Sequence, residues 1–132
     1  MTDEQIALAR RAVACKGWRW LPGTRTTDAM RVIHDETAFP GRPCAIREGS
    51  WVDTSPPRPL GDALPDLTDP ATLGCVLALV REAWSDPAIC VVLDLSDGYW
   101  HVGRWEDEGI ALRGRWGTTE AHALTLALEG AP

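Results

Sequence analysis

Asp94, His101 and Arg115, all in the C-terminal half of the chain, are residue types that could do chemistry together. A carboxylate beside an imidazole raises the pKa of the imidazole and fixes its tautomer, as a catalytic pair requires. The same residue types also form charged ladders across the exposed faces of ordinary sheets. Because the sequence places no nucleophile beside them, a structural ladder is the favoured interpretation and catalysis is the alternative.

Motifs for metal, phosphate or nucleophile chemistry are absent from the sequence. The three histidines, His34, His101 and His122, lack the spacing of metal ligands, and none of the four cysteines stands in a C-x-x-C pair. There is no glycine-rich phosphate loop and no G-x-S-x-G nucleophile motif. We therefore predict no metal site and no cofactor.

Tryptophan is unusually frequent, with seven residues against one phenylalanine and one tyrosine. The strand and helix patterns described below place Trp84, Trp100 and Trp116 on core faces, but they do not place the other four. Exposed tryptophan beside arginine is typical of a protein interface. The candidate interaction residues are therefore Trp18, Arg19, Trp20, Trp51 and Trp105. The alternative is that a proline-rich segment covers some of these rings.

The length and charge limit the class of protein. A chain of 132 residues fits a single domain over 1–132, and its formal net charge of -6 disfavours general nucleic-acid binding. A run of acids, Glu106, Asp107 and Glu108, is either a solvated turn or a local acidic patch. The N-terminus has no export signal and no apolar stretch is long enough to span a membrane, so we predict a cytoplasmic protein with reduced thiols.

The element pattern predicts an α+β fold, in which an antiparallel sheet packs against about three helices. Helices are expected from Thr2, from the Asp69 N-cap with Pro70 at N1, and from Thr118 or Thr119. Strands are expected at 18–21, 30–34 and 44–47. Residues 51–68 hold four prolines and read as a strap over the surface, either ordered or mobile.

Residues 88–116 predict a three-stranded antiparallel meander with two tight turns. Asp97-Gly98 is typical of a two-residue hairpin loop, which would place Asp94 opposite His101. At the second turn, a three-residue loop would bring Arg115 beside His101, whereas a four-residue loop would place Val102 opposite Arg113. We adopt the three-residue loop because it gathers these apolar residues on one face: Leu93, Leu95, Trp100, Val102, Ile110, Leu112 and Trp116.

Two stretches of the C-terminal half resemble small uncharacterised proteins of phages and prophages of GC-rich bacteria. They are Leu67-Thr68-Asp69-Pro70-Ala71-Thr72-Leu73-Gly74-Cys75, continuing to Arg81-Glu82-Ala83-Trp84, and Thr119-Glu120-Ala121-His122-Ala123-Leu124. Both are capped helices with an apolar stripe, so the resemblance assigns no functional residue. It implies a phage-type accessory role.

Two functions from different classes follow. The first is a non-enzymatic phage- or prophage-type accessory protein that binds a host or phage protein, or a second copy of itself. Inhibition of a defence system would suit its acidic surface. The second is a small enzyme or ligand-binding domain that uses Asp94, His101 and Arg115. A deep pocket beside His101 would favour the second, and a flat aromatic patch would favour the first.

Overall fold

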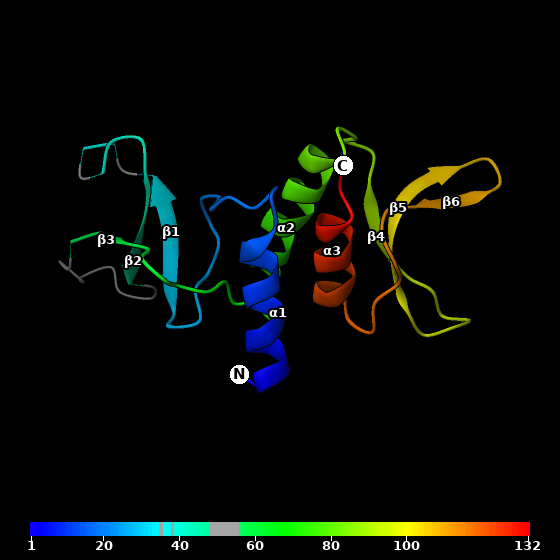
Figure 1. Cartoon of the computed structure of the whole chain (residues 1–132), viewed down its shortest axis with the longest axis horizontal. Coiled ribbons are helices and arrows are strands. Elements are labelled where there is room, and N and C mark those ends of the chain that lie inside the picture. The colour runs from blue at the N-terminus through cyan, green and yellow to red at the C-terminus, as the bar shows by residue number, and fades with distance from the viewer. Residues whose placement is uncertain (35, 38, 48–55) are drawn as a thin grey trace.

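The computed structural model describes residues 1–34, 36–37, 39–47 and 56–132. Within these residues, three helices lie between two three-stranded antiparallel sheets (Figure 1). The strand orders are β1-β2-β3 and β4-β5-β6. The α+β class and the C-terminal meander predicted from the sequence are therefore confirmed, with the strands divided between two sheets.

The first helix, α1, spans Asp3–Ala14 and begins at the predicted capping box. The Thr2 side chain accepts a hydrogen bond from the Gln5 backbone, and the Gln5 side chain accepts one from the Thr2 backbone. Both bonds satisfy N–H groups that a helix start leaves without a partner. Ala9 and Ala12 are completely buried, so this helix packs closely against the others through small side chains.

The second helix, α2, spans Pro70–Ala83 and provides the centre of the core. Asp69 is its N-cap and accepts hydrogen bonds from the backbone and the hydroxyl of Thr72, as the sequence predicts. The apolar stripe is buried, and its deepest residues are Val76, Leu79 and Val80. The helix therefore holds its place through both its cap and its apolar face.

The third helix, α3, spans Glu120–Glu129 with Thr119 as its N-cap. Its inner face, including Leu124 and Leu128, completes the main core together with residues of α1, α2 and the second sheet. The indole N–H of Trp84 donates a hydrogen bond to the Ala127 carbonyl at 2.8 Å. That carbonyl lies in the last turn of α3, where no helical N–H is available to it.

The first sheet consists of β1 (Met30–His34), β2 (Pro43–Arg47) and β3 (Arg58–Pro59). The strand β3 belongs to the predicted proline-rich strap and pairs at the sheet edge, where a proline is tolerated. Trp51 and the rest of 51–55 lie outside the described residues. The predicted strand at 18–21 is wrong, since these residues pair with no strand in the described structure. An ion pair of 2.9 Å between Arg31 and Asp69 joins this sheet to the start of α2.

The second sheet consists of β4 (Cys90–Leu93), β5 (Trp100–Glu106) and β6 (Gly109–Leu112). One face packs against the helices through buried residues such as Val102, and the other face is turned away from them (Figure 1). All four cysteines are free. No helix among the described residues is both long and apolar enough to cross a membrane.

Candidate functional site

The turn between β4 and β5 is longer than the sequence predicts. Leu93 pairs with Trp100, and the Asp94 N–H donates to the Tyr99 carbonyl at 3.0 Å. The expected two-residue loop at Asp97-Gly98 is therefore wrong, and four residues connect the paired ends. Because the register moves by two residues, the paired side chains keep their predicted faces. The predicted core position of Leu95 is wrong, because this residue lies in the longer turn and is 90% exposed. Asp94 and His101 still share a face, as diagonal rather than direct neighbours.

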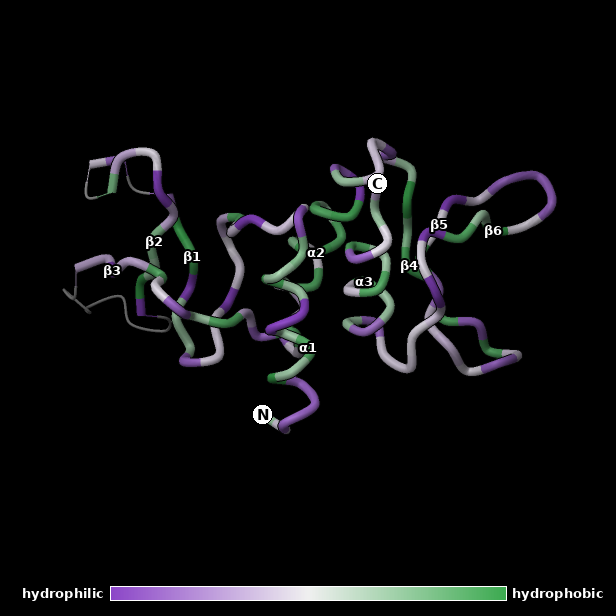
Figure 2. Tube along the Cα trace, in the orientation of Figure 1, coloured by the Kyte–Doolittle hydropathy of each residue, from purple (hydrophilic) through white to green (hydrophobic). Residues whose placement is uncertain are grey.

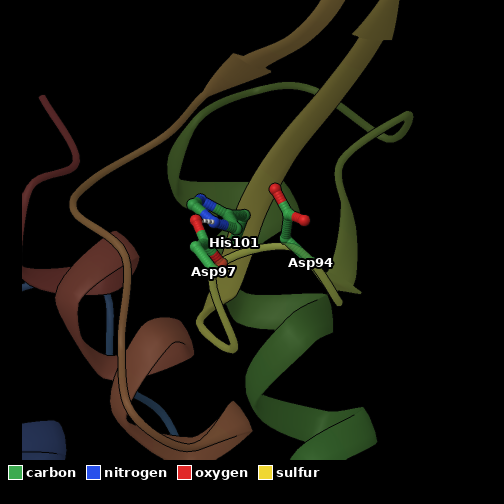
Figure 3. A group of neighbouring side chains, drawn as sticks. All are labelled: Asp94, Asp97 and His101. Atoms are coloured by element: carbon green, nitrogen blue, oxygen red, sulfur yellow. Dashed lines mark hydrogen bonds and ion pairs between the residues drawn. The ribbon is translucent and has the colours of Figure 1, made fainter.

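His101 and two aspartates form a compact group at this turn (Figure 3). The Nε2 atom of His101 lies 3.1 Å from an Asp97 carboxylate oxygen, and its Nδ1 atom is buried with no hydrogen-bond partner among the described residues. Asp94 accepts hydrogen bonds from the Ser96 hydroxyl and backbone, and these bonds hold the pKa of Asp94 below its ordinary value. Sequence reasoning missed Asp97, because it assigned this residue to the turn alone.

The same three residues are the described side chains that could hold a metal ion. One ligand atom from each of Asp94, Asp97 and His101 lies within 4.8 Å of the others. Both carboxylates already accept backbone hydrogen bonds that shape the turn, from Ser96 and Tyr99 respectively. The turn itself is therefore a sufficient explanation for their position.

The register between β5 and β6 differs from the predicted one by a single residue. Trp105 pairs with Ile110, and the Arg113 N–H donates to the Val102 carbonyl at 2.8 Å. The pairing that we did not adopt, with Val102 opposite Arg113, is therefore the correct one. A shift of one residue reverses the faces of a strand, so Ile110 and Leu112 point away from the core.

A buried carboxylate explains why the chain adopts this register. Asp86 is 8% exposed, and its side-chain oxygen lies 3.6 Å from Arg113 and 3.7 Å from Arg104. Only the observed register turns Arg113 to the core side, where it also lies over the Trp84 ring. A buried charge needs such a partner, and this need outweighs the gathering of apolar residues on one face.

Arg115 does not join His101 in a cross-strand row. The pairing of β6 ends at Leu112, and an isolated bridge then joins Trp100 to Gly117. Arg115 lies in the connection between them and is exposed. The structure thus brings Asp94 and His101 together, adds Asp97, and leaves Arg115 outside the ladder.

The outward face of the second sheet carries exposed aromatic and aliphatic side chains. Trp105 is 63% exposed, Trp116 is 49% exposed and Leu112 is 45% exposed. The predicted core position of Trp116 is therefore wrong, and its ring stacks on Tyr99 with centroids 4.0 Å apart. We call this surface the outer sheet face and define it by Trp105, Ile110, Leu112, Trp116, Tyr99, Val92 and Cys90.

The other candidate interaction residues have different surroundings. Trp18 packs against the main core and meets Trp20 edge to face, with ring centroids 5.3 Å apart. Arg19 is exposed and pairs with Glu82 at 2.6 Å. Trp105 is therefore the one predicted interaction tryptophan in the described residues whose ring is mostly exposed.

Comparisons of this chain with protein families, with curated proteins and with solved structures find no match.

Proposed function

We propose that this chain is a non-enzymatic protein-binding module and that the outer sheet face is its binding surface. The observation that carries this proposal is the register of β6, which places half-buried Ile110 and exposed Leu112 on the outer sheet face beside Trp105. The alternative register would have buried these apolar residues, and the observed register places them on an outward face instead. Apolar residues gathered on an outward face are typical of an interaction site. Tryptophan is among the residue types that contribute most to binding at such surfaces.

The resemblance of two helices to phage-encoded proteins supports a phage- or prophage-type accessory role for this module. Its partner is then a host or phage protein, and inhibition of a defence system is one role that such binding serves. An enzyme or ligand-binding domain built on Asp94, His101 and Arg115 is the alternative. It has less support, because Arg115 lies outside the ladder and a hollow of about 520 Å³ is lined by residues at the C-terminal ends of the three helices, away from His101.

The experiment places a photo-crosslinking amino acid at Leu112 in the organism that encodes the chain. We expect one protein adduct, and none from the same probe at Ala78, an exposed position on α2. The identified partner, once purified, should bind the wild-type chain and lose binding to the double variant Trp105→Ala/Leu112→Ala.

The matched control tests the other predicted surface. The double variant Arg19→Ala/Trp20→Ala removes the exposed ion pair with Glu82 and one ring of the edge-to-face pair. It should bind the partner as the wild type does. Binding lost in this variant and kept in Trp105→Ala/Leu112→Ala would move the interface to the first tryptophan cluster and refute the proposal.

A further inference from the structure

The outer sheet face has carboxylates at both of its ends. Asp107 and Glu108 form the β5–β6 turn next to Glu106, the last residue of β5, and Asp94 and Asp97 lie in the β4–β5 turn. Successive turns of a meander lie at opposite ends of its strands, as Figure 1 shows. Figure 2 shows the β5–β6 turn as hydrophilic and β6 beside it as hydrophobic. The apolar surface is therefore bordered by acids in both directions.

The three carboxylates at the β5–β6 end of the face are not neutralised within the described residues, whereas Asp97 at the other end pairs with His101. Glu106, Asp107 and Glu108 are exposed and take part in no ion pair or hydrogen bond of their side chains there. Of the three arginines nearby, Arg104 and Arg113 contact Asp86 on the opposite side of the sheet. Arg115 is the remaining cation of this segment, so negative charge dominates the border.

From this border we infer that the partner is a basic protein segment whose apolar side chains are flanked by lysine or arginine; the inference rests on the proposed function. The apolar side chains cover Trp105 and Leu112, while the cations meet the carboxylates at the two turns. Complementary charges at the border of an interface speed association and exclude acidic partners. Flanking cations on one segment fit both ends of the face at once.

A second copy of this chain fits the same surface less well. Both ends of the face are acidic, so two copies placed face to face bring acids against acids in either orientation. The face is also small: three strands about 4.8 Å apart, even over the 7 residues of β5 at about 3.3 Å each, span roughly 330 Å². A stable dimer buries about 800 Å² on each partner, whereas a short segment needs less.

The test uses two synthetic peptides of equal length, in which leucine alternates with either lysine or glutamate. Binding to the full chain is measured by fluorescence anisotropy at low and high salt. We expect the lysine peptide to bind, the glutamate peptide to bind at least about tenfold more weakly, and salt to weaken the lysine peptide. No binding of the lysine peptide, or equal binding of the two peptides, overturns the inference.

Two triple variants with the same change in net charge separate the border from the overall charge. Glu106→Gln/Asp107→Asn/Glu108→Gln should weaken the lysine peptide about tenfold, as three solvent-exposed charge pairs allow. Asp3→Asn/Glu4→Gln/Asp62→Asn removes three exposed acids elsewhere and should change binding by less than about twofold. Equal weakening in both variants would mean attraction by net charge alone and overturn the inference.

The variant Trp105→Ala/Leu112→Ala distinguishes failure of the inference from failure of the proposed function. Loss of lysine-peptide binding in this variant supports both. Unchanged lysine-peptide binding shows that the face is not the site, so the proposed function fails too. If the wild-type chain binds both peptides equally and this variant binds neither, the outer sheet face is the binding site but does not prefer cations. That result overturns the inference and keeps the proposed function. If sedimentation shows that the wild-type chain is a dimer and that this variant is a monomer, a second copy of the chain occupies the face, and the inference is overturned.

Discussion

Replacement of Trp84 by alanine is expected to lower the free energy of unfolding by about 3–4 kcal/mol. The ring is half-buried against the core, so about 100 Å² of indole surface at about 25 cal/mol per Å² contributes about 2.5 kcal/mol. Its hydrogen bond to Ala127 contributes about 1 kcal/mol. Ala127 is fully buried, and the variant leaves its carbonyl at the end of α3 without this donor.

The conservative variant Trp84→Phe separates these two contributions. It keeps most of the packing and loses the indole N–H, so a loss of about 1–2 kcal/mol is expected. Urea unfolding followed by circular dichroism measures both variants. The matched control is Trp105→Ala, which removes an exposed ring and should change stability by no more than about 0.5 kcal/mol. A loss below about 1 kcal/mol for Trp84→Ala would refute the assigned packing of α2 against α3.

Other perturbations test the rest of the fold. Gly117→Ala should destabilise the fold by about 1–3 kcal/mol in urea melts, because the added Cβ would lie 2.4 Å from the Ala123 nitrogen. Gly74→Ala should stabilise it by up to about 1 kcal/mol, because the space beside Gly74 on α2 is open. A stability change of the same sign in both variants would contradict this packing. Burial raises the pKa of Asp69, but hydrogen bonds from Thr72 and Arg31 outweigh it and hold this pKa below its ordinary value. The charge therefore stabilises the fold above about pH 4, and this part is lost as pH falls through the lowered pKa. The difference in free energy of unfolding between the wild type and Asp69→Asn should therefore become smaller in acid. A difference that does not change with pH would contradict a stabilising role of the Asp69 charge. Thiol titration of the denatured chain without reductant should find all four cysteines, and fewer would indicate disulfides.

Local signals in the sequence were sufficient for the helices and for the strands β1 and β2, although not for their pairing. The Thr2, Asp69 and Thr119 caps lie where the pattern predicts them, since a cap depends on residues within one turn. The strand at Met30–His34 also has the predicted bounds, and the β2 strand differs by one residue. Such elements depend on chain neighbours, so tertiary contacts change them little.

The candidate site depended on two registers that the sequence could not decide. For the first turn, the Asp97-Gly98 signal predicted a tight loop, but the Asp94 side chain bonds Ser96 and shapes a wider one. The face of Asp94 and His101 was still predicted correctly, because an error of two residues preserves the alternation of a strand. The identity of Asp97 as the partner of His101 followed only from the folded turn.

For β6, the error of one residue concealed the surface on which the proposed function rests. The sequence by itself determined the helices, the α+β class, the meander and the sheet face on which Trp105 lies, but not whether its ring is exposed. Whether Leu112 faces the core or solvent was decided by Arg113, which is drawn inward by the buried carboxylate of Asp86. Asp86 and Arg113 are 27 positions apart in the sequence. Their pairing is a tertiary contact, and a local pattern of apolar residues cannot predict which cation a buried carboxylate will pair with.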